Sequence, residues 1–324
     1  MMKEVRAKDS RFYAAFVSSA ASFAFLTKQL SMPNRIDIIF SALLAGAAYL
    51  LMRLFRFRGN VRLQYEMNAL LIFGCICSAG GMMAKLGSFL RYTRFCDVGT
   101  AFLAGIVFVF CCAVFEKGSV GAERFAVISA AGILFLLLLI ALFGKGTINV
   151  FHLASDSGHR GTAALHIVEG ALYILPLLLS TVHLNGVNAV FICTAPLLLC
   201  FIPAAVFGGI ISKVAYPLYE ALLCMDSELL QGLDGIVFTC VLLAVLCHTT
   251  ACAACISKAL HNIRCNCRAR YILVSVLAAV AVLVFSSFEK EIAGWVLFYI
   301  LLASITLKCV SVLCGKGGRD EAKN

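Results

Sequence analysis

The chain has 324 residues, of which 62% are hydrophobic and 14% are charged, and its formal net charge at pH 7 is +10. Its mean hydropathy of +0.96 excludes a sizeable soluble domain. Because hydrocarbon offers no water to unpaired backbone groups, this composition predicts an all-α polytopic membrane protein.

Ten apolar stretches fill almost the whole chain, and short loops separate them. A helix that rises about 1.5 Å per residue needs roughly 20 residues to cross about 30 Å of hydrocarbon, so most stretches have the length of one span. In chain order, the predicted spans are 12–30, 36–55, 67–90, 98–115, 126–143, 163–182, 187–211, 233–256, 271–288 and 292–314.

The basic residues indicate how these spans are oriented. Seventeen Lys and Arg lie in the N-terminal segment, the C-terminal tail and every second loop, whereas the alternate loops hold nine. Short loops rich in Lys and Arg tend to stay in the cytoplasm, so both termini are expected there. The positive charge then reflects topology, and no nucleic acid is expected as a partner. We expect no cleavable signal peptide, because the first apolar segment lacks a small-residue cleavage site.

Polar residues inside the first and sixth spans are candidates for a binding site, because they are costly in lipid. The first span carries Ser18, Ser19 and Ser22, a run that suits either close helix packing or a binding site. The sixth holds His166 and Glu169 one turn apart, followed by Gly170. An ionised Glu facing lipid is expensive, so this carboxyl is expected to be protonated, paired with the histidine, or turned toward a polar cavity.

The third and eighth spans also contain polar residues. Ser78 precedes two glycines that permit close backbone approach, and Lys85 is positioned to snorkel toward the outer interface. In the eighth span, the hydroxyls of Thr249 and Thr250 are expected to bond to carbonyls one turn back. Thr249 is also a candidate ligand contact.

The sixteen cysteines do not predict a metal site. Most lie inside apolar spans, where free Cys behaves as a small hydrophobic residue. Cys252 and Cys255 share one helix face with His248 one turn earlier, but a zinc site would need four ligands and no second pair is evident. Signatures of phosphate loops, paired-histidine zinc helices and nucleophile elbows are absent. We therefore predict no metal, no cofactor and no enzymatic activity.

The span count suggests two five-helix halves of inverted topology, residues 1–144 and 163–314, followed by a cytoplasmic tail, 315–324. In such folds, spans one and six are broken around a site at the membrane midplane. We therefore expect a ligand to bind between spans one, three, six and eight. The candidate ligand-binding residues are Ser18, Ser19, Ser22, Ser78, His166, Glu169, Gly170 and Thr249.

Two segments carry a resemblance to a known family. Residues 216–223 read Tyr-Pro-Leu-Tyr-Glu-Ala-Leu-Leu, and residues 229–234 read Leu-Leu-Gln-Gly-Leu-Asp. This stretch resembles the GerAB-type spore germination permeases, where a Tyr-Pro-x-x-Glu segment leads through a short amphipathic helix into a Glu-Arg-apolar-acidic motif. Residues 116–124, with the sequence Glu-Lys-Gly-Ser-Val-Gly-Ala-Glu-Arg, resemble the family's connection before span five. Gln231 and Gly232 replace the Glu-Arg pair, and Asp234 alone matches.

The resemblance implies the fold of the amino acid, polyamine and organocation (APC) transporter superfamily, which is LeuT-like. It also implies a permease-like subunit of a germinant receptor in the spore inner membrane, with A-type and C-type subunits as partners and a small amino-acid-like nutrient as ligand. In this hypothesis the serine hydroxyls bind the ligand, Gly170 provides an unwound backbone, and Glu169 with His166 forms a charge or proton partner. Two alternatives stay open: a proton-coupled secondary transporter of similar solutes, and a structural spore-membrane protein that has lost the ligand site.

Overall fold

The structure is a computed structural model. It describes residues 2–28, 61–93, 99–117, 119–143, 168–174, 201–224, 233–262, 268–287 and 296–307. Within these ranges, regular secondary structure is entirely helical, which confirms the predicted all-α class. The predicted span 36–55 lies outside the described residues, as does His166.

Six long helices coincide with predicted spans. They are α1 (Met2–Leu26), α3 (Val61–Thr93), α4 (Thr100–Lys117), α5 (Ser119–Phe143), α9 (Leu233–Asn262) and α10 (Arg268–Ser287). Residues 168–174 and Val296–Leu307 are helical parts of the predicted sixth and tenth spans. α1 is continuous through its serine run, so the break expected near these serines does not occur within Met2–Leu26.

The segment between the predicted spans seven and eight is itself folded. Residues 201–207 are α-helical, and Gly208 has a φ of 55°, a conformation that favours glycine. A 3-10 turn, η3 (Gly208–Lys213), follows, so the α-helix ends before position 211, where the span was predicted to end. α8 (Pro217–Leu223) then begins at a proline, which fits the first helical position because no N–H partner is needed there. The Tyr-Pro-x-x-Glu segment itself is thus helical from its proline onward.

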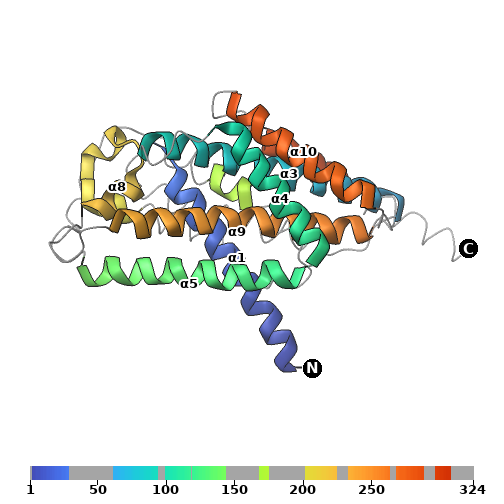
Figure 1. Cartoon of the computed structure of the whole chain (residues 1–324), viewed down its shortest axis with the longest axis horizontal. Coiled ribbons are helices and arrows are strands. Elements are labelled where there is room, and N and C mark those ends of the chain that lie inside the picture. The colour runs from blue at the N-terminus through green and yellow to red at the C-terminus, as the bar shows by residue number, and fades with distance from the viewer. Residues whose placement is uncertain are drawn as a thin grey trace, which may run out of the picture.

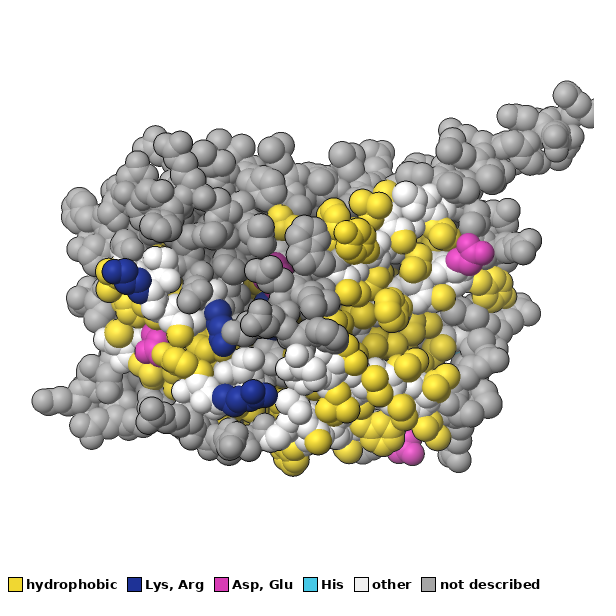
Figure 2. All heavy atoms as spheres, turned by 90° about the horizontal axis from the view of Figure 1, so that it is seen from above, with side chains coloured by type: hydrophobic (Ala, Val, Ile, Leu, Met, Phe, Trp, Pro, Cys, Tyr) yellow, Lys and Arg dark blue, Asp and Glu magenta, His cyan; other side chains and the backbone are white. Residues whose placement is uncertain are grey.

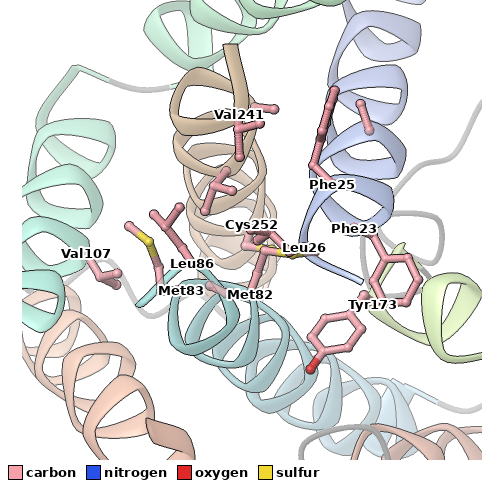
Figure 3. Packing of buried hydrophobic residues seen from close by; sticks show 14 of the residues in the cluster. Phe23, Phe25, Leu26, Met82, Met83, Leu86, Val107, Tyr173, Val241 and Cys252 are labelled. Carbon is pink, nitrogen blue, oxygen red and sulfur yellow. The ribbon is translucent and has the colours of Figure 1, made fainter. Parts of the chain in front are cut away.

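α9 lies at the centre of the bundle, where it packs against α1, α3, α4 and α5 (Figure 1). α10 packs against α3 and α4, and α1 also packs against α5. α3 and α9 lie side by side and run in opposite directions (Figure 1). The core between them is formed by apolar side chains from several helices, including Met82, Met83, Leu86, Val107 and Val241 (Figure 3).

Small residues allow α3 to approach α10 closely, as the third-span sequence predicts. A Cβ added at Gly80 would lie 2.7 Å from the Ala281 Cβ and 3.0 Å from the Ala281 carbonyl carbon. Real Cβ atoms do not approach one another this closely, so the contact requires glycine at position 80.

Two of the described helices, Tyr65–Thr93 and Gly235–His261, are long and apolar enough to cross a membrane. Large hydrophobic side chains also cover outward faces of the bundle. On α10, the exposed ones are Ile272, Leu273, Val276, Leu277, Val280, Leu283 and Val284. Figure 2 shows a broad hydrophobic area on the face seen from above, with the few charged side chains lying toward its edges. The ten-span arrangement itself stays a prediction.

Candidate functional site

A buried chain of hydrogen bonds joins four helices. The His248 ring on α9 lies between Ser19 on α1, 3.0 Å from Nδ1, and Ser78 on α3, 2.9 Å from Nε2. The Ser78 hydroxyl also donates to the carbonyl oxygen of Tyr173, in helix 168–174, over 2.7 Å. All four residues are fully buried. We call this arrangement the four-helix chain.

Both serines of this chain also reach a backbone carbonyl. The Ser78 hydroxyl donates to Tyr173, and the Ser19 hydroxyl donates to the carbonyl oxygen of Ala15, one turn back on α1, over 2.8 Å. Each serine oxygen is then able to accept from the ring nitrogen that it faces. A neutral ring carries a single N–H, so only one of the two serines accepts from it at a time.

Two of the other candidate hydroxyls donate to backbone carbonyls of their own helices. Ser22 donates to the Ser19 carbonyl over 2.8 Å, and Thr249 donates to the Val245 carbonyl over 3.0 Å. The predicted back-bonding of Thr249 is thus confirmed. Ser18 is fully buried, and its hydroxyl has no hydrogen-bond partner among the described residues.

An ion pair between Lys85 and Glu169 lies next to the four-helix chain. The Lys85 ammonium is 2.6 Å from the Glu169 carboxylate, and the two side chains are 14% and 18% exposed. The same ammonium lies 4.8 Å from the ring centroid of Phe23 and 5.3 Å from that of Tyr173. Figure 3 shows these two rings side by side where α1 meets helix 168–174. We call these four side chains the Lys85–Glu169 layer.

The ion pair corrects one expectation from the sequence. Lys85 does not snorkel away from the bundle, because a carboxylate and two aromatic rings hold its ammonium inside. Lys85 is also a partner of Glu169 that the sequence did not suggest; the predicted pairing with His166, which lies outside the described residues, stays a prediction. The sequence missed the pairing because 84 residues separate the two partners.

Gly170 has a role different from the predicted one. It lies within the helical residues 168–174, so its backbone is not unwound. A Cβ added there would lie 2.8 Å from Cδ1 of Phe23 and 2.9 Å from Cε1. The glycine therefore makes room for the Phe23 ring, and this keeps the ring against Lys85.

Helix geometry stacks the Lys85–Glu169 layer on the four-helix chain. Lys85 follows Ser78 by seven residues on α3, which is about two helical turns, or roughly 10 Å. Phe23 follows Ser19 by one turn on α1, and Tyr173 follows Glu169 by one turn in helix 168–174. The same three elements therefore contribute to both, and a solute held between them would touch hydroxyls on one side and paired charges on the other.

His248 connects the four-helix chain, but it is not among the ligand-binding residues predicted from the sequence. The sequence drew attention to it as a neighbour of Cys252, whose sulfur lies 3.7 Å from Nε2. Among the residues that the structure describes, no group of three or more His, Cys, Asp or Glu is arranged to hold a metal ion. An ionisable ring in the middle of an apolar helix was the signal that points to a site.

The segment that resembles the germination permeases is held by the end of α3. Tyr92 donates to the Glu220 carboxylate over 2.6 Å, and the Phe89 ring packs edge-on against Tyr216 and Tyr219 with centroids 5.1 Å apart. The Tyr-Pro-x-x-Glu residues are therefore anchored to the helix that carries Ser78 and Lys85.

Comparison with known proteins does not assign the chain to a family: no family model matches it, and no curated protein matches it.

Proposed function

We propose that the chain is a permease-type integral membrane protein that binds a small amino-acid-like solute between α1, α3, helix 168–174 and α9. Following its resemblance to germination permeases, we infer that it serves as the ligand-sensing membrane subunit of a spore germinant receptor, with A-type and C-type subunits as partners. One observation carries the proposal: four helices converge on a buried hydrogen-bond chain beside a paired positive and negative charge.

The depth of this chain supports a membrane site. Ser78 lies near the centre of the apolar helix Tyr65–Thr93, and His248 lies near the centre of Gly235–His261. If both helices cross a bilayer, their centres lie near its midplane, where permease-type sites are found. The exposed hydrophobic face of α10 agrees with contact to lipid.

The helix contacts support two inverted halves. In that arrangement the second half repeats the first, so α9 is the counterpart of α3, and α10 is the counterpart of α4. A contact between α3 and α10 therefore predicts a matching contact between their counterparts, α9 and α4. Both contacts occur. The contact of α1 with α9 likewise has a counterpart in the contact of helix 168–174 with α3. The opposite directions of α3 and α9 also fit the inversion (Figure 1).

The ends of the bundle support the predicted orientation. The start of α3, the end of α4, the start of α5, the end of α9 and the start of α10 lie toward the same end of the bundle (Figure 1). These are the helix ends that adjoin the basic-rich loops. A membrane protein keeps such loops in the cytoplasm, so this end is expected to face the cell interior.

The charges favour a zwitterionic solute. An amino acid carries an ammonium and a carboxylate, which match Glu169 and Lys85 respectively. Such a solute is able to replace the internal ion pair with two pairs of its own, so it binds without leaving a buried charge unpaired. Its binding would also separate α3 from helix 168–174 at this point, which links occupancy to helix position.

Binding of radiolabelled amino acids to the purified protein in lipid nanodiscs tests this proposal. We expect saturable binding that Glu169→Gln abolishes without loss of folded protein, and a matched loss of the nutrient response in spores. Lys213→Met, at an exposed position, is the control and is expected to bind normally. Normal binding and response in Glu169→Gln would remove Glu169 from the site.

A second function, a proton-coupled transporter of similar solutes, is favoured by the ionisable ring of His248 at the centre of α9. Uptake into sealed vesicles separates the two functions. A transporter accumulates labelled amino acid when a proton gradient is applied, whereas a receptor subunit binds it without accumulation.

A further inference from the structure

We propose that Glu169, Phe23 and Tyr173 form a binding site for a primary alkylammonium, and that the Lys85 side chain is its built-in occupant. We call these three side chains the ammonium cage. A solute binds there by replacing the Lys85 ammonium with its own. The cage is independent of any nutrient, but its use for the amino group of a nutrient rests on the function proposed above.

The Lys85 ammonium is held from three sides. The Glu169 carboxylate accepts its hydrogen bond over 2.6 Å, and the ring centroids of Phe23 and Tyr173 lie 4.8 Å and 5.3 Å from the nitrogen. Both rings are within the roughly 6 Å over which an aromatic face attracts a cation. Within the part of the chain that the structure describes, this carboxylate is the only hydrogen-bond acceptor of the ammonium. One anion and two aromatic faces are the surroundings that suit an organic ammonium.

The cage and its occupant come from different helices. Phe23 lies on α1, Glu169 and Tyr173 lie in helix 168–174, and Lys85 reaches in from α3. The two rings contact each other directly, with centroids 5.7 Å apart, as Figure 3 shows. Gly170 gives the Phe23 ring its room. Since none of these positions depends on α3, the cage is expected to persist when the lysine leaves it.

Displacement of Lys85 sets a condition on the solute. The lysine side chain is only 14% exposed, so its ammonium needs a new anionic partner once it has left Glu169. A simple amine supplies none, whereas an amino acid supplies its own carboxylate. Lys85 is therefore a specificity-determining residue, because it excludes amines that lack a carboxylate and admits zwitterions.

Chemical rescue of a truncated variant tests the cage. Lys85→Ala removes three carbon atoms and a nitrogen, which are the heavy atoms of n-propylamine, so n-propylammonium restores both the lost volume and the lost charge. Thermal unfolding of the purified protein in lipid nanodiscs would be followed while this probe is added. We expect the Tm of Lys85→Ala to rise by about 2–4 °C at roughly ten times the Kd of the probe. The Tm of the wild type should not rise, because Lys85 occupies its cage.

A second measurement applies if Lys85→Ala is recovered unfolded. The variant would then be extracted from membranes in the presence of n-propylammonium or of n-propanol, its uncharged counterpart. We expect a higher yield of folded protein with n-propylammonium, because only the charged probe pairs with Glu169.

Matched variants identify what holds the probe. Lys85→Met keeps most of the side-chain volume, so it should not respond to n-propylammonium. In the Lys85→Ala background, Glu169→Gln should abolish the response, and Phe23→Leu should raise the Kd of the probe about two- to thirty-fold by removing one aromatic face. Phe25→Leu replaces an equally buried ring on the same helix and should leave this Kd unchanged.

Two results would overturn the ammonium cage: no gain in Tm or folded yield of Lys85→Ala with n-propylammonium, or an equal gain with n-propanol. An equal rise in the Tm of the wild type would refute the role of Lys85 as occupant. The probe is not a nutrient, so the two proposals fail separately. Rescue of the variant in a protein whose wild type binds no amino acid would refute the proposed function and leave the cage standing.

Discussion

Removing the Lys85 ammonium should destabilise the protein more than neutralising Glu169. Lys85→Met removes the ammonium that is paired with the Glu169 carboxylate in a mostly buried position. Glu169→Gln leaves the ammonium between the Phe23 and Tyr173 rings, where cation–π attraction still stabilises it. The asymmetry follows from the two rings, since an isolated ion pair would lose similar amounts with either change.

The size of the expected loss in unfolding free energy follows from how deeply the Lys85–Glu169 pair is buried. Removing one partner of a fully buried pair costs about 3–5 kcal/mol, and exposed pairs contribute about 0–1 kcal/mol. With side chains 14% and 18% exposed, this pair is close to the buried limit. We expect a loss of about 2–4 kcal/mol for Lys85→Met, after allowing for solvent screening. Glu169→Gln should cost about 1–2 kcal/mol, because each cation–π contact retains about 0.5–2 kcal/mol.

A double-mutant cycle measures the pairing itself. The free energy of unfolding in detergent micelles would be compared for the wild type, the two single variants and the variant that carries both changes. The double variant should lose less free energy of unfolding than the two single variants lose together. The difference, which is the coupling energy of the pair, should be about 1–3 kcal/mol. Lys213→Met is the exposed control and should change stability by less than about 0.5 kcal/mol. Additive single losses, or a larger loss for Glu169→Gln than for Lys85→Met, would refute the reasoning.

Two further predictions concern packing and anchoring. Gly80→Ala should cost about 1–3 kcal/mol in unfolding free energy, because its Cβ has no room against α10. Gly105→Ala is the matched control, because nothing lies within 4 Å of a Cβ added there. Equal losses of stability in the two variants would contradict the close approach of α3 and α10. Tyr92→Phe should cost about 1 kcal/mol and speed hydrogen exchange in η3 and α8, because the bond to Glu220 is lost. Tyr65→Phe, equally exposed on the same helix, should leave that exchange unchanged.

Predicted span positions were accurate where the signal was local. A long apolar stretch must satisfy its backbone by helix formation, so α3, α4, α5, α9 and α10 could be read from hydropathy alone. The end of a span depends on finer conformational choices. At Gly208 a positive φ ends the α-helix within an apolar stretch, and hydropathy cannot detect such a change.

The candidate site was predicted in part. Ser19 and Ser78 were identified because hydroxyls in apolar helices are rare and costly. Thr249 was favoured over its neighbour His248, yet the ring faces the bundle interior while the threonine bonds to its own helix. Residues adjacent in sequence point in directions about 100° apart on a helix, so their roles are decided by how the helix is rotated against its neighbours.

By itself, the sequence determined that the chain is helical, which stretches form the helices, and that hydroxyls, a glycine and two opposite charges lie within them. These are consequences of local composition, because helix formation in an apolar stretch needs no distant partner. Tertiary structure alone decided that Lys85 pairs with Glu169 and that His248 joins Ser19 to Ser78. These contacts link residues 84 to 229 positions apart. Their geometry depends on the packing of four helices, which no local pattern specifies.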